Sequence, residues 1–158
     1  MKLQMALVVF LILVAFAASG GVFFRPGTHY EALKKPTWTP PNRVFPVAWT
    51  ILYIMIAIAG WLVWRAEGAG AALWFWVIQL VLNGVWSWFF FGRKDIRLAL
   101  YDILLLLAMI VAFIIAAAPT STWAALLFLP YLAWVGFATA LNWRIFQLNG
   151  RRPAGSQG

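Results

Sequence analysis

The sequence predicts an all-α membrane protein, a bundle of five transmembrane helices with a long first loop as its lid. Its composition is 65% hydrophobic and only 10% charged, which no ordinary soluble domain shows. Five apolar runs reach the roughly 20 residues that a helix needs to cross the hydrocarbon layer. The runs are continuous rather than alternating, so helices and not barrel strands satisfy the backbone in lipid.

The five predicted spans are residues 3–24, 44–64, 71–91, 96–118 and 123–146. The first resembles a signal peptide in its Lys2 and its small residues at 17–21, but its apolar stretch is too long, and we expect a retained helix. We assign residues 1–148 to one five-helix domain and residues 149–158 to a polar, disordered tail. Only the first connection, residues 25–43, is long. Its Tyr30, Trp38, Pro36, Pro40 and Pro41 are typical of a functional loop.

Basic residues predict the orientation. Of the 12 Lys and Arg residues, only Lys2 and Arg65 fall on the side of the N-terminus, and all others fall on the opposite side. The positive-inside rule places the C-terminus in the cytoplasm and the N-terminus outside, and helical spans favour a bacterial inner membrane. The net charge of +8 is distributed between apolar spans, so we expect no nucleic-acid partner.

Few side chains are suited to metal or thiol chemistry. The chain has no cysteine, one histidine and four acidic residues. Disulfides and Cys-based metal sites are excluded, and so are most multi-ligand metal sites, so no metal site is expected. We interpret His29 as a loop residue rather than a haem ligand. Asp102 is the only acid within a predicted span, and we expect it to pair with a nearby Arg or Tyr.

Tryptophan is unusually frequent, with 11 residues. Most of them lie near span ends, where the ring suits the membrane interface, and we expect this role for Trp61, Trp64, Trp74, Trp76, Trp123 and Trp143. Trp49, Trp86 and Trp134 lie further inside, close to amide side chains. Large aromatic planes beside a few polar groups suit a flat, apolar ligand.

Polar and aromatic residues recur at helical spacing within the spans. The third span places four on one face, Gln79, Asn83, Trp86 and Phe90. The fifth span does the same with Tyr131, Trp134, Ala138 and Asn142, and the second places Trp49 four residues before Tyr53. The amides either hold the helices together through hydrogen bonds or line a ligand cavity, and the residues alone favour neither alternative.

Three blocks of the sequence resemble one known family. The first is residues 30–53, YEALKKPTWTPPNRVFPVAWTILY. The second combines Gln79-Leu80, Asn83 and Trp86 with residues 89–92, FFFG. The third is residues 130–134, PYLAW, followed by Ala138-Thr139 and Leu141-Asn142. Together they are similar to the translocator protein family, which includes TspO, the tryptophan-rich sensory proteins and the peripheral benzodiazepine receptor, over all five spans in order.

The resemblance implies a homodimer of five-helix bundles that binds porphyrin, haem, sterols and isoquinoline or benzodiazepine drugs beneath the first loop. It favours the cavity over simple interhelical bonding. By motif position, the ligand-binding residues would be Trp38, Trp49, Gln79, Asn83, Trp86, Phe90, Trp134, Ala138 and Asn142. Trp143 and Gln147 replace the Tyr and Arg of the family's cholesterol motif, so a dedicated cholesterol site is not expected.

We therefore expect an integral membrane receptor or sensor that binds tetrapyrroles and regulates or scavenges them, with no required cofactor. One alternative is a transporter of porphyrins or sterols, although five helices do not divide into two equal repeats. Another is light- and oxygen-dependent porphyrin degradation. The sequence has no nucleophile–base pair and no nucleotide loop, so we assign no catalytic residue.

Overall fold

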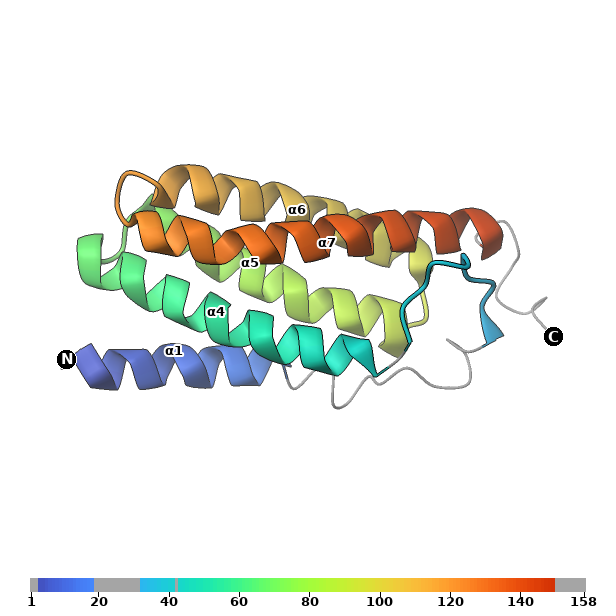
Figure 1. The fold of residues 1–158 in the computed structure, drawn as a ribbon, viewed down its shortest axis with the longest axis horizontal. Coiled ribbons are helices and arrows are strands. Elements are labelled where there is room, and N and C mark those ends of the chain that lie inside the picture. Colours follow the sequence, from blue (N-terminus) through green and yellow to red (C-terminus); the bar gives the residue numbers. More distant parts are fainter. Residues whose placement is uncertain (1–2, 19–31, 42, 150–158) are drawn as a thin grey trace.

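A computed structural model describes residues 3–18, 32–41 and 43–149, and this part of the chain is built from helices without strands. The helices are α1 (Leu3–Ala18), α4 (Val44–Glu67), α5 (Ala71–Ser87), α6 (Ile96–Ala117) and α7 (Thr122–Asn149). A π-helical turn, η1 (Trp88–Gly92), extends α5. All run roughly along one long axis (Figure 1).

Four of these helices are long and apolar enough to cross a membrane, and α1 is a shorter apolar helix. The predicted all-α, multi-pass membrane protein is thereby confirmed. The first predicted span, 3–24, is seen as a helix as far as Ala18, and its last six residues lie outside the described part. The predicted lid, 25–43, is described only at residues 32–41 and 43. His29 and Tyr30 therefore also lie outside the described residues.

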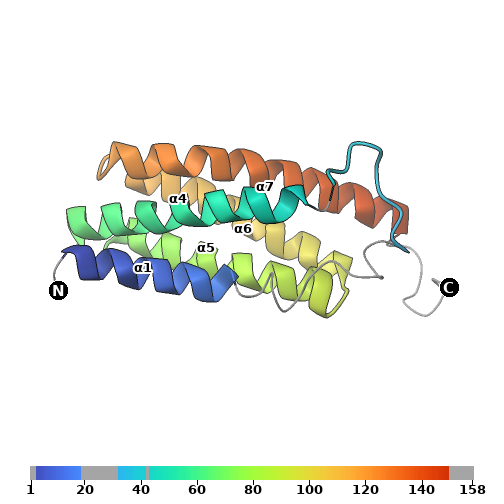
Figure 2. The same ribbon diagram turned by 60° about the horizontal axis from the view of Figure 1, so that its bottom comes forward.

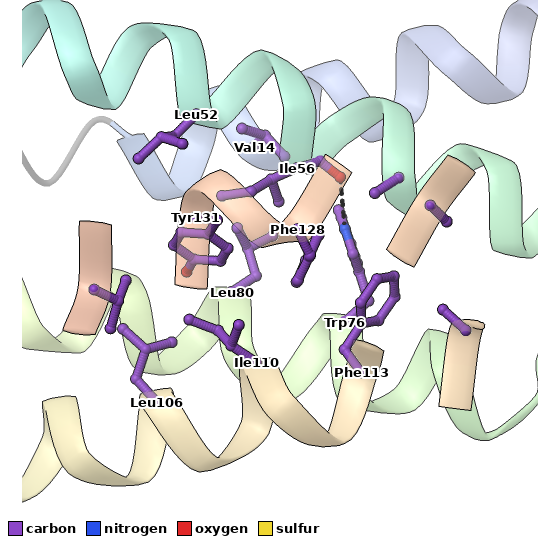
Figure 3. Packing of buried hydrophobic residues seen from close by; sticks show 14 of the residues in the cluster. Val14, Leu52, Ile56, Trp76, Leu80, Leu106, Ile110, Phe113, Phe128 and Tyr131 are labelled. Atoms are coloured by element: carbon purple, nitrogen blue, oxygen red, sulfur yellow. Dashed lines mark hydrogen bonds between the residues drawn. The ribbon is translucent and has the colours of Figure 1, made fainter. Parts of the chain in front are cut away.

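The helices form a layered bundle in which α5 packs on α6, α6 on α7, α7 on α4 and α4 on α1. A smaller contact joins α1 to α5, as the second view shows (Figure 2). The core between them contains large, fully buried side chains (Figure 3). Phe113 of α6 lies against Phe128 of α7, with ring centroids 4.0 Å apart.

Trp76 corrects one prediction from the sequence. Its ring is 1% exposed and does not lie at the membrane interface. Its Nε1 donates a hydrogen bond of 2.8 Å to the carbonyl of Ile56 on α4 (Figure 3). Its ring packs edge-on with Phe10 of α1, with centroids 5.0 Å apart. Gly60 makes room for it, since a Cβ there would lie 2.4 Å from Trp76 Cε2. By contrast, Trp74 and Trp123 are 60% and 72% exposed, as interface anchors are.

Local sequence explains where the helices begin and end. The carboxylate of Asp95 accepts a hydrogen bond of 3.0 Å from the Leu98 amide and caps α6. Gly68, with φ of 69°, ends α4 in a backbone conformation that suits glycine. The helix α7 continues through Pro130 and ends at Asn149, three residues beyond the predicted end at 146. The last turn of the third span is π-helical, which the sequence did not predict.

The described basic residues follow the predicted asymmetry along the bundle. Lys34, Lys35, Arg43, Arg93, Lys94, Arg97 and Arg144 lie at the end where α4 and α6 begin and where η1 and α7 end. Arg65 lies near the opposite end, in the last turn of α4. We call the end where α4 and α6 begin and where η1 and α7 end the basic end.

Candidate functional site

A chain of hydrogen bonds crosses the middle of the bundle. Tyr53 of α4 donates to Asn83 Oδ1, Asn83 Nδ2 donates to the Tyr131 hydroxyl, and that hydroxyl donates to Gln79 Oε1, each at 2.8 Å. Gln79 Nε2 then donates to the carbonyl of Trp76 at 2.9 Å. Gln79, Asn83 and Tyr131 are at most 2% exposed. The chain therefore ties α4, α5 and α7 together where water cannot replace a lost partner.

A second polar contact lies closer to the basic end. Trp86 Nε1 of α5 donates to Asn142 Oδ1 of α7 at 3.0 Å. Asn142 Nδ2 in turn donates to the carbonyl of Ile96, the first residue of α6, at 3.2 Å. The Trp86 ring stacks on Phe90, with centroids 5.1 Å apart. The amides Gln79, Asn83 and Asn142 thus hydrogen-bond between or within helices, and their contact with a ligand stays a prediction.

Rings from α4 and α7 gather into what we call the aromatic cluster: Phe45, Trp49, Tyr53, Tyr131, Trp134 and Phe137. Trp49 stacks on Tyr53, with centroids 5.3 Å apart, and meets Trp134 edge-on at 6.3 Å. Phe45 and Phe137 each lie 5.8 Å from Trp134. The two predicted residues Trp49 and Trp134 are therefore brought together at the centre of a large π surface.

The indole nitrogen of Trp134 is a buried polar atom within the aromatic cluster. This Nε1 has no hydrogen-bond partner among the described residues. A buried donor left unpaired costs about 1–3 kcal/mol. The rings that contact Trp134, namely Phe45, Trp49 and Phe137, offer no strong acceptor. The free donor is therefore suited to an acceptor that a bound molecule would bring.

Asp102 is the second buried exception. Its side chain, on α6, is 7% exposed, and its Oδ2 has no hydrogen-bond partner in the described part of the chain. From the sequence, an Arg or Tyr partner is expected, and the described residues provide none for this atom. A carboxylate in this position is costly in lipid and is tolerated only where the bundle shields it.

Ala138 and Trp38 complete the predicted set. Ala138 is 7% exposed on the inner face of α7, between the levels of Tyr131 and Asn142. Trp38 lies in the segment of residues 32–41 and is 47% exposed. Its ring packs edge-on against Phe137, with centroids 5.6 Å apart.

Sequence reasoning missed Phe45 and Phe137 as members of the aromatic cluster. Their spacing could have indicated them, because Phe45 precedes Trp49 by four residues and Phe137 follows Trp134 by three. Both intervals place side chains on one helix face. Tyr131 was placed on the polar stripe, but its role as the junction of the hydrogen-bond chain depends on contacts between helices.

Comparison with known proteins agrees with this architecture. The sequence matches the profile of the TspO/MBR family over residues 6–148. It is 40% identical to the tryptophan-rich sensory protein of Cereibacter sphaeroides over 144 residues, which cover 91% of each chain. It is 41% identical to the tryptophan-rich protein TspO of Chlorobaculum tepidum over 140 residues, or 86% of this chain and 89% of the relative. The translocator protein of Ovis aries is 37% identical over 131 residues, or 80% and 78%.

Tyr131→Phe tests the hydrogen-bond chain. It removes a hydroxyl and leaves the Asn83 and Gln79 amides without their partner, so we expect a loss of about 1–3 kcal/mol in stability. Thermal unfolding in detergent would measure it. Tyr101→Phe, at a side chain that is 57% exposed, is the control and should change little. Equal midpoints for the two variants would show that the chain contributes no stability.

Proposed function

Because the chain belongs to the TspO/MBR family, we propose that it is a membrane receptor or sensor that binds tetrapyrroles such as porphyrin and haem. Its role would be to regulate or scavenge these pigments. Two relatives bear the names tryptophan-rich sensory protein and translocator protein, which supports a function in sensing or handling a ligand at the membrane. The fold supplies the membrane-spanning helices that this requires.

The observation that carries the proposal is the unpaired Trp134 Nε1 inside the aromatic cluster. A tetrapyrrole offers a large flat π surface and peripheral acceptor groups. The Trp49 and Trp134 rings lie at 89° to one another. The macrocycle would stack on the Trp49 ring and meet the edge of Trp134, whose Nε1 would donate its hydrogen bond to an acceptor of the ligand. The donor would then gain the partner that it lacks among the described residues.

The charge of the basic end favours a tetrapyrrole over a sterol. Porphyrin and haem carry two carboxylates at one edge, whereas a sterol has a single neutral hydroxyl and no aromatic face. Phe45 of the aromatic cluster is only two residues from Arg43, so the cluster lies near the basic end. The ligand carboxylates would point towards these cations.

The remaining predicted residues would form the walls around the macrocycle. Ala138 would leave a flat surface on α7, and Trp38 would cover the ligand from the loop side. Gln79, Asn83 and Asn142 would keep the helices at a fixed spacing through their hydrogen bonds. Trp86 and Phe90 would extend the aromatic surface towards the basic end.

We further infer that the basic end faces the cytoplasm of a bacterium, with the protein in the inner membrane. The support is the concentration of Lys and Arg at this end. The N-terminus would then lie outside and the C-terminus inside.

Trp134→Phe is the most direct test of the binding mode. It keeps an aromatic ring but removes the N–H donor, so we expect the affinity for protoporphyrin IX to fall about tenfold. Titration of the detergent-purified protein, followed by tryptophan fluorescence, would measure it. We expect Trp49→Phe to weaken binding as well, because it reduces the stacking surface.

The matched control for both variants is Trp123→Phe, which changes a tryptophan that is 72% exposed at the start of α7. It should bind like the unchanged protein. Non-saturable quenching, or equal affinity in all three variants, would show that Trp49 and Trp134 serve packing rather than ligand binding.

The orientation can be tested with two single cysteines, since the chain has none of its own. Ala118→Cys and Arg97→Cys are at exposed positions at opposite ends of α6. A membrane-impermeant maleimide added to intact spheroplasts should label position 118 and leave position 97 unlabelled until the cells are lysed. The reverse pattern would contradict the proposed orientation.

A further inference from the structure

We propose that Asn149 is a latch that holds residues 32–41 across the aromatic cluster and so sets the rate at which the ligand enters and leaves. We call residues 32–41 the strap. The inference rests on the proposed function for its ligand, but the latch itself is defined by contacts within this chain.

The side-chain amide of Asn149 binds the strap through both of its polar atoms. Lys34 N donates to Asn149 Oδ1 at 3.0 Å, and Asn149 Nδ2 donates to Lys34 O at 2.8 Å. One amide thus satisfies both backbone groups of a residue that is 115 positions away in the sequence. Asn149 Nδ2 also donates to Ile145 O at 2.9 Å, which fixes the side chain on its own helix. Asn149 is 6% exposed, so these hydrogen bonds are shielded from water.

Neighbouring contacts show that the strap is ordered around this latch. Leu33 is 5% exposed and packs with Phe90, Ile96 and Ile145, which join the strap to η1, α6 and α7. Beyond Lys34 the strap makes a turn in which the amide and the hydroxyl of Thr39 both donate to the carbonyl of Pro36, at 3.1 and 2.7 Å.

The strap then reaches the proposed ligand site through one ring. Trp38 packs edge-on against Phe137, and Phe137 lies against Trp134. Trp38 is 47% exposed, so its side chain buries a smaller share of its surface than that of Leu33 does. The strap is therefore held firmly at its Lys34 end and lightly at Trp38. Loss of the latch would let Trp38 leave Phe137 and uncover the route to Trp134.

This arrangement makes Asn149 a positioning residue that acts through the strap and never touches the ligand. A ligand that passes only when the strap is open enters and leaves at rates proportional to the open population. Weakening the latch raises that population in the free and the bound protein alike. Both rates then rise together, while the dissociation constant changes little.

The test compares Asn149→Ala, Asn149→Asp and Gln147→Ala. Asn149→Ala removes all contacts of the amide. Asn149→Asp keeps an acceptor for Lys34 N but loses the donor to Lys34 O and Ile145 O. Gln147→Ala is the matched control, since this exposed side chain on the same helix end accepts a hydrogen bond from Arg144.

Two readouts separate the latch from the proposed function. Stopped-flow quenching with protoporphyrin IX gives the association and dissociation rates. A nitroxide on Thr37→Cys, a unique thiol on the exposed part of the strap, reports strap mobility without any ligand. Thermal unfolding is recorded for each variant, and a latch role requires that Asn149→Ala is still folded at the temperature of the rate measurements.

We expect Asn149→Ala to raise both rates about tenfold, corresponding to the loss of its hydrogen bonds. Asn149→Asp should fall between it and the unchanged protein, and Gln147→Ala should match the unchanged protein. The nitroxide should gain mobility in the same order. A mobile strap with unchanged rates would overturn the gating role while leaving ligand binding intact.

An immobile nitroxide in Asn149→Ala would overturn the latch itself, whatever the ligand does. If protoporphyrin IX fails to bind the unchanged protein, the proposed function fails and the gating role with it, although the nitroxide still reports on the latch.

Discussion

Inside the hydrocarbon layer no water can replace a lost hydrogen bond, so each polar side chain must pair within the protein or with a ligand. Tyr131 meets this requirement for the middle of the bundle, because its hydroxyl accepts from Asn83 and donates to Gln79. Tyr53 extends the chain to α4. These bonds fix the spacing of three helices, and the aromatic cluster is built on the same residues of α4 and α7.

Two buried atoms of the described residues break this pairing rule, and they differ in their surroundings. Asp102 Oδ2 lies on α6, a helix that contributes no ring to the aromatic cluster. Trp134 Nε1 lies among rings that pack against one another at centroid distances near 6 Å. An unpaired donor beside a broad π surface is what a flat ligand with peripheral acceptors would satisfy. The proposed ligand binding depends on this atom more than on the amides, which have partners already.

Helix positions could be predicted from the sequence because a lipid environment makes long apolar runs nearly unambiguous. The faces of α5 and α7 followed from spacing, and Gln79, Asn83 and Asn142 are buried as those faces require. Contacts that join distant parts of the chain could not be predicted. Trp76 is buried because Gly60, on another helix, leaves it room. From the sequence, Asn149 was assigned to the start of the tail, because its partner Lys34 lies 115 residues away and no local pattern indicates the contact.

The indole N–H signals of tryptophan, recorded by ¹⁵N NMR with and without protoporphyrin IX, test the central claim most directly. Trp134 Nε1–H has no acceptor among the described residues, whereas Trp76 Nε1–H is bonded to Ile56 O. Saturating porphyrin should shift or broaden the Trp134 signal, and should leave the Trp76 signal in place. An unmoved Trp134 signal at saturation would contradict the account, because the ligand would then lie elsewhere in the protein.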